Sequence, residues 1–135
     1  MSRVCWPLSE GRPVVEVSFI PPGNGREAPR VLLADTGAGT RNSAWHIVPS
    51  EEDCRRFRFR ETPPVRLGGA FVGNFPTYLV RAAIPQLRFS RIVVAVSVPA
   101  DGSPPGLDGI AGCSFLNAFH YGNCGRTDQF CLEVA

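Results

Sequence analysis

The stretch Val31-Leu32-Leu33-Ala34-Asp35-Thr36-Gly37-Ala38 places one acid on a tight turn directly after an apolar run. The run is typical of a buried strand, and a hydroxyl residue followed by glycine lets the backbone turn sharply at its end. A carboxylate is rarely placed in apolar surroundings unless it is paired or functional, because an isolated buried charge is strongly disfavoured. We therefore expect this strand to deliver the Asp35 carboxylate to a functional site.

The composition around this stretch is that of a single globular domain with many short elements. The chain has 135 residues, of which 44% are apolar and 19% charged, and neither value is typical of a disordered protein. Its 13 prolines and 14 glycines divide it into short segments, which favours strands joined by turns over long helices. A net charge of +2 is too small to indicate a nucleic acid or an anionic membrane as a partner.

Periodicity and turn residues predict a mainly β domain over residues 14–135, preceded by a loosely ordered arm over residues 1–13. Strands are expected at Val14–Ile20, Arg30–Ala34, Arg56–Arg60 with Val65–Leu67, Tyr78–Ala82, Ile92–Val98 and Gln129–Val134. The turn cluster after Ile20 predicts that the first two strands form an antiparallel hairpin. Short helical segments are expected after Ser50, where acids follow a capping residue, and at Ser114–Phe119.

The first residues, the longest apolar run and the cysteines indicate in which cellular compartment the protein is expected. Residues Met1–Pro7 lack the apolar core of a signal peptide, and the longest apolar run, Ile92–Val96, is too short to span a bilayer. We therefore expect a cytoplasmic protein without a membrane partner. The five cysteines form an odd set with irregular spacing, so free thiols are expected rather than a disulfide framework.

Two more segments follow the Asp-Thr-Gly-Ala turn in a recognisable order. A glycine-rich segment, Gly68–Gly73, lies some thirty residues later, and Gly109-Ile110-Ala111-Gly112 leads into a short apolar helix near the C-terminus. In this order, from about Val14 to Val134, the chain resembles the retropepsin-like, single-lobe aspartic proteases. The resemblance implies a mainly β, closed acid-protease β-barrel lobe with a short C-terminal helix.

The resemblance also implies roles for particular residues. Asp35 is the catalytic acid, and it is the one acid of this kind in the chain because Asp-Thr-Gly occurs once. The residues implied to support the active-site loop are Thr36, Gly37, Ala38, Ile110, Ala111 and Gly112. The residues implied to form a flap over an extended peptide are Gly68, Gly69, Ala70 and Phe71.

One acid per chain implies a homodimer, since the chemistry needs two. Two neighbouring carboxylates cannot both ionise and so share a proton; one then activates a water while the other polarises the peptide carbonyl. The implied activity is that of an aspartic endopeptidase acting on peptide or protein substrates, without metal or cofactor. Gly39, Thr40 and Cys113 stand where viral members usually have charged residues that pair near the interface, so those contacts are not expected here.

Other interpretations of the same residues remain open. Asp35 alone also fits a turn aspartate whose side chain accepts a backbone hydrogen bond, within an unrelated small β-barrel. The same fold also suits a non-catalytic, dimeric peptide-binding or interaction module.

Three further residue groups were weighed as functional sites. The arginines of Arg55–Arg60, interleaved with phenylalanines, also fit a nucleic-acid stripe, but nearby acids favour a strand with its arginines in water. His120, Cys124 and Cys131 lack paired metal-ligand spacing, so no metal site is expected. His46 has no nucleophile that would complete a triad, and we expect a core or surface histidine.

Overall fold

The structure is a computed structural model that describes residues 2–23, 25–57, 59–67 and 72–134, and it is mainly β as predicted. Its strands are β1 (Arg3–Pro7), β2 (Val14–Ile20), β3 (Ala28–Ala34), β4 (Ile47–Pro49), β5 (Arg60–Leu67), β6 (Gly73–Ile84), β7 (Phe89–Val96), β8 (Gly109–Ala111), β9 (His120–Gly122) and β10 (Gln129–Glu133). The helices are α1 (Glu51–Arg56) and α2 (Cys113–Leu116), with 3-10 turns η1 (Pro85–Leu87) and η2 (Ala100–Gly102).

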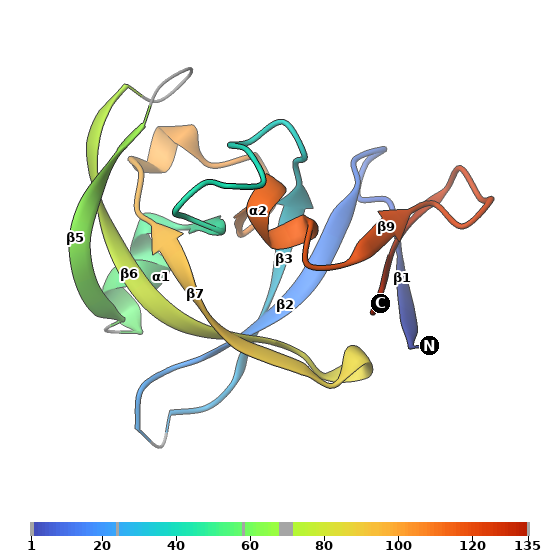
Figure 1. Cartoon of the computed structure of the whole chain (residues 1–135), viewed down its shortest axis with the longest axis horizontal. Helices are drawn as coiled ribbons and strands as arrows, with labels where there is room; N and C mark the ends of the chain where they lie inside the picture. The colour runs from blue at the N-terminus through green and yellow to red at the C-terminus, as the bar shows by residue number, and fades with distance from the viewer. Residues whose placement is uncertain (1, 24, 58, 68–71, 135) are drawn as a thin grey trace.

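Among the described residues, six strands close into a barrel. Their order is β2-β3-β8-β4-β7-β6, and pairing of β6 with β2 completes the ring (Figure 1). Closure removes free sheet edges, which would otherwise expose unpaired backbone groups. β5 continues the sheet beyond β6, and the two strands form a long hairpin at one side of the barrel (Figure 1). The closed β-barrel expected from the sequence is therefore present.

The barrel is filled by apolar side chains from strands that were predicted from local pattern. β2 has the bounds expected for the first strand, and its Val15, Val17 and Phe19 have no exposed surface. β2 pairs antiparallel with β3, which confirms the hairpin. α2 covers one end of the barrel with Phe115, whose ring lies 6.0 Å from that of Phe89. This helix ends at Leu116, three residues before the end expected from the sequence.

The segment after Ser50 is helical as predicted, but the strand expected at Arg56–Arg60 was wrong. Ser50 accepts a hydrogen bond from the backbone N–H of Asp53, and α1 extends to Arg56 with Phe57 at its C-terminal cap. Acids in the first turn and arginines in the last turn both favour the helix through its dipole. The capped helix therefore forms at Arg56 in spite of the alternating pattern of arginines and phenylalanines, and β5 begins only at Arg60.

The N-terminal residues do not form the loosely ordered arm that the sequence predicted. β1 pairs antiparallel with β10, and β10 pairs with β9, giving a separate three-stranded sheet at the right of Figure 1. Trp6 of β1 is 8% exposed and joins the main core. The expectation of free thiols was also wrong for two cysteines, because Cys5 and Cys131 form a disulfide between these strands. Both errors have one cause: the partner of β1 lies 126 residues away in the sequence.

The expected flap lies between β5 and β6 in the sequence. Its four named residues, Gly68, Gly69, Ala70 and Phe71, lie outside the described residues. The strands that lead to the tip are paired as far as Leu67 with Gly73. In the described part of the chain, every helix is too short or too polar to cross a membrane.

Candidate active site

Asp35 is the first residue after β3, and a neighbouring parallel strand fixes its position. β8 pairs with β3 so that Leu33 lies opposite Ile110 and Ala34 opposite Ala111. The ladder continues one step further, because the Asp35 N–H donates to the Ala111 carbonyl at 3.0 Å. The Asp35 turn and the Ile110-Ala111-Gly112 segment, predicted as partners from the sequence, are therefore joined by backbone hydrogen bonds.

Within the turn, backbone groups orient the Asp35 carboxylate. The Gly37 N–H donates to Oδ1 of Asp35 at 3.0 Å, and the Ala38 N–H donates to the Asp35 carbonyl at 3.1 Å. Asp35 is half-buried, while Thr36 and Gly37 are exposed. No ion pair in the described part of the chain involves this carboxylate. The hydrogen bond from Gly37 is the one expected of a turn aspartate, and it also holds one carboxylate oxygen at the surface in a fixed orientation.

The ring of Trp45 packs against this turn, a contact that the sequence did not predict. A Cβ added to Gly112 would lie 2.7 Å from Cζ3 of the Trp45 ring, and one added to Gly39 would lie 2.9 Å from its Cζ2. The ring therefore packs against the backbone of both the Asp35 turn and the segment after β8. The Cys113 N–H donates to the Ala38 carbonyl at 2.9 Å and joins the same two segments. A tryptophan ten residues after the acid gave no local signal, since the contact depends on folding.

His46, just before β4, joins the segment after β8 to β7. Its N–H donates to the Val94 carbonyl, its Nδ1 accepts from the Val94 N–H, and its carbonyl accepts from the Gly112 N–H. Burial lowers the pKa of His46, because a charged imidazole loses hydration there. The neutral ring is also the form that can accept at Nδ1. This is a structural histidine within the fold, as the sequence predicted.

The structure thus brings together seven of the residues predicted for the site. Hydrogen bonds connect the two backbone segments that carry them, which are Asp35, Thr36, Gly37 and Ala38 in one and Ile110, Ala111 and Gly112 in the other. The four predicted flap residues lie outside the described residues, so their placement relative to Asp35 stays a prediction.

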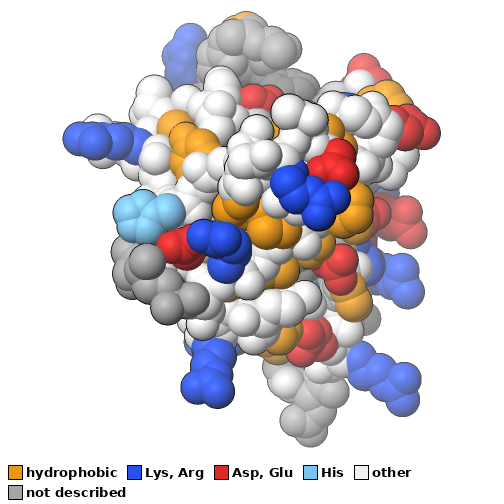
Figure 2. All heavy atoms as spheres, turned by 90° about the vertical axis from the view of Figure 1, so that its right-hand side faces the viewer, with side chains coloured by type: hydrophobic (Ala, Val, Ile, Leu, Met, Phe, Trp, Pro, Cys, Tyr) orange, Lys and Arg blue, Asp and Glu red, His pale blue; other side chains and the backbone are white. Residues whose placement is uncertain are grey.

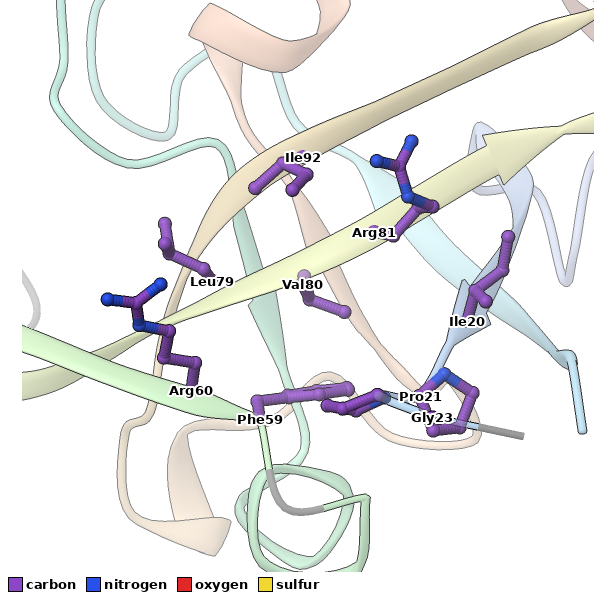
Figure 3. Close-up of a pocket in the computed structure, with 10 residues that line it drawn as sticks. Ile20, Pro21, Gly23, Phe59, Arg60, Leu79, Val80, Arg81 and Ile92 are labelled. Carbon is purple, nitrogen blue, oxygen red and sulfur yellow. The ribbon is translucent and has the colours of Figure 1, made fainter. Parts of the chain in front are cut away.

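A cavity of about 410 Å³ lies elsewhere on the barrel. Figure 3 shows it between β2, β5, β6 and β7, with Phe59, Val80 and Ile20 among its lining side chains. Asp35 and the residues that support it are not among those that line it.

Comparison with known proteins supports the fold of the chain. No protein-family model matches the chain, and no curated protein matches it. Among solved structures, the chain is similar to an EIAV protease complexed with the inhibitor HBY-793, at 19% sequence identity and a TM-score of 0.50. The match covers 78% of this chain and 86% of that one. The fold is retropepsin-like, as the order of the sequence motifs predicted.

Proposed function

We propose that the chain is one half of a homodimeric aspartic endopeptidase in which Asp35 from each copy forms the catalytic pair. The observation that supports this most directly is the Asp35 turn itself. Its carboxylate lies at the surface end of a barrel strand, oriented by the Gly37 N–H and anchored through the backbone to Ala111. A rigid backbone cradle for one acid is what a precisely positioned general acid or base requires.

A second carboxylate must come from another molecule. Two acids a few ångströms apart share one proton, so that one is a base and the other an acid at the same pH. The base removes a proton from a water, and the water attacks the peptide carbonyl while the acid donates a hydrogen bond to the carbonyl oxygen. A two-fold axis beside the Asp35 turn supplies the second acid with the same geometry.

The β5–β6 hairpin suits an extended peptide as substrate. Its paired strands project from the barrel (Figure 1), and an extended peptide is bound by backbone hydrogen bonds when it is added to such a strand. In this proposal the residues that follow β5 in the sequence, Gly68, Gly69, Ala70 and Phe71, serve as the flap over the peptide.

The decisive experiment compares wild type with Asp35→Asn, using a diverse peptide library across acidic to neutral pH. We expect cleavage by the wild type and a loss of about 10²–10⁴-fold in the variant, since one general acid–base group is removed from each half. Asp101→Asn is the matched control, because Asp101 is an exposed acid in η2. Circular dichroism and sedimentation show whether the variant keeps its fold and its mass.

Three results would contradict the proposal in different ways. A wild-type chain that stays monomeric at every concentration cannot assemble the acid pair. Equal cleavage by wild type and Asp35→Asn places the activity elsewhere. A folded dimer that binds peptides equally with and without the Asp35 carboxyl, and cleaves none, is the non-catalytic peptide-binding module instead.

A further inference from the structure

The disulfide between β1 and β10 occupies a position at which antiparallel strands come closest. The Leu8 N–H donates to the Asp128 carbonyl at 3.1 Å, so these residues form a hydrogen-bonded pair. Pairs alternate along an antiparallel ladder, which makes Cys5 and Cys131, three steps further, a pair without hydrogen bonds. The closer approach at such a pair brings the two side chains together on one face of the sheet.

A third sulfur lies against this disulfide. The Sγ atoms of Cys5, Cys124 and Cys131 all lie within 4.8 Å of one another. Cys124 is in the loop between β9 and β10 and is exposed, whereas Cys131 is 1% exposed. Figure 2 faces the side of the molecule that carries these strands, where apolar side chains lie between arginines and acids.

The loop that carries Cys124 is held in an unusual conformation. Cys124 has a φ of 53°, in the left-handed region that residues other than glycine rarely adopt. Asn123 holds the loop on both sides of this residue: its side chain accepts from the Gly125 N–H, and its carbonyl accepts from the Gln129 side chain, at 3.0 Å each. The loop therefore fixes the thiol beside the disulfide despite the backbone strain.

A positive charge lies on the same face. Arg3 of β1 forms an ion pair with Glu133 at 2.9 Å. Arg3 and Glu133 lie two residues along their strands from Cys5 and Cys131, so the four side chains share one face of the sheet. The thiolate is the form of cysteine that attacks a disulfide, and the exposed position of Cys124 leaves its sulfur accessible to solvent bases.

We propose that Cys5, Cys124 and Cys131 form a thiol–disulfide exchange site that releases β1 from its covalent link to β10. The Cys124 thiolate attacks Sγ of Cys131, a Cys124–Cys131 bond forms, and the Cys5–Cys131 bond breaks. The electron pair leaves on Sγ of Cys5, which then takes up a proton. One disulfide replaces another, so the step needs neither an oxidant nor a reductant.

Burial favours Cys5 as the leaving group. Attack on Cys5 would instead expel a thiolate at Cys131, where the side chain is almost completely buried and a charge loses its hydration. Cys5 is only partly buried, so its thiolate is less costly. The product disulfide lies within the β9–β10 hairpin, and β1 is then held by hydrogen bonds and packing alone.

Three nearby thiolates are also a ligand set for soft metal ions such as Zn²⁺ or Cu⁺. Two of the three sulfurs are already bonded to each other in this structure, so the set exists only after reduction. Exchange requires one free thiol beside a disulfide, which is the state of these three sulfurs in the structure. Metal binding by the reduced chain is therefore an alternative outcome of the test.

The test maps disulfides by mass spectrometry after non-reducing incubation near pH 8, acid quenching and alkylation. A Cys113→Ser background removes the other partly exposed thiol, and Cys54 stays unreactive because burial raises its pKa to about 11. In this background we expect both Cys5–Cys131 and Cys124–Cys131 bonds, and alkylation of Cys5 about 10-fold or more faster than after further Cys124→Ser substitution. Cys5→Ser, oxidised with glutathione disulfide, should form Cys124–Cys131 as its disulfide.

A second measurement avoids dependence on the substituted chain. Blocking the exposed Cys124 with N-ethylmaleimide in the otherwise folded protein should abolish the Cys124–Cys131 bond and protect Cys5 from alkylation. Exclusive Cys5–Cys131 pairing, with Cys5 equally protected whether Cys124 is free or blocked, overturns the proposal. One tightly held Zn²⁺ per reduced chain, lost on Cys124→Ser, with no exchange in the oxidised chain, overturns it in favour of a metal site.

Discussion

The ring of Trp45 packs against the backbone of Gly112, leaving no room for a side chain at that position. A Cβ on Gly112 would lie 2.7 Å from the ring and 3.0 Å from the Ala38 carbonyl oxygen. The φ of Gly112 is −86°, which any residue adopts, so the requirement for glycine here is steric. The contact links the Asp35 turn to the segment after β8 through a side chain that neither motif contains.

Gly112→Ala should therefore lower the free energy of unfolding by about 1–3 kcal/mol, because either the ring or the Ala38 carbonyl must move. Urea denaturation measures this loss. Gly122→Ala is the matched control, since a Cβ at that β9 residue would meet nothing within 4 Å. We expect the control to change stability by no more than about 0.5 kcal/mol. An equal loss of unfolding free energy in the two variants would show that the contact between Trp45 and Gly112 does not exclude a side chain at position 112.

Asp53→Ala should destabilise the chain by about 3 kcal/mol, since it leaves a mostly buried arginine without its partner. Arg30 of β3 donates to both carboxylate oxygens of Asp53, at 2.8 and 3.1 Å, and thereby ties α1 to the strand that precedes Asp35. Glu52→Ala, one residue earlier in the same helix turn and exposed, is the control and should cost about 0.5 kcal/mol or less. Thermal and urea unfolding give both values. A similar cost for the two substitutions contradicts a special role for this pair.

His46 should make the fold weaker in acid. Its pKa is lowered in the folded chain, so below about pH 6.5 the unfolded chain binds a proton that the folded chain resists. The free energy of unfolding should therefore fall as the pH drops through this region, until the folded chain is protonated as well. His46→Asn keeps an acceptor for the Val94 N–H without the titration. Urea unfolding between about pH 7 and 5 should give a shallower decline for the variant, whereas parallel curves would rule out this source of acid sensitivity.

The Cys5–Cys131 disulfide should stabilise the oxidised chain by about 4–5 kcal/mol relative to the reduced chain, because it closes a loop of most of the sequence. The comparison belongs in a Cys124→Ser background, where no shorter disulfide can replace it. Denaturation with and without reductant measures the difference. The same comparison with Cys5 also changed to serine is the control, and reductant should then have no effect. An unchanged midpoint in the first chain would mean that the link does not restrain unfolding.

Local sequence predicted the elements whose signals come from near neighbours. The apolar run before Asp35 gave β3, the turn cluster after Ile20 gave the hairpin with β2, and the cap at Ser50 gave α1. The partnership of Asp35 with Ile110–Gly112 was also expected, but from the order of motifs in a known family rather than from any local pattern. Alternation at Arg56–Arg60 misled because a capped helix competes for the same residues.

The sequence by itself determined that this chain is mainly β and that it presents a lone acid on a glycine turn, because strand pattern and turn chemistry act over a few residues. Only the tertiary structure decided that Trp45 lies under Gly112 and that β1 pairs with β10. The tertiary structure also brings together the sulfur atoms of Cys5, Cys124 and Cys131. These contacts join residues distant in sequence, and their free energy is gained only after folding has closed the long loops of chain between them.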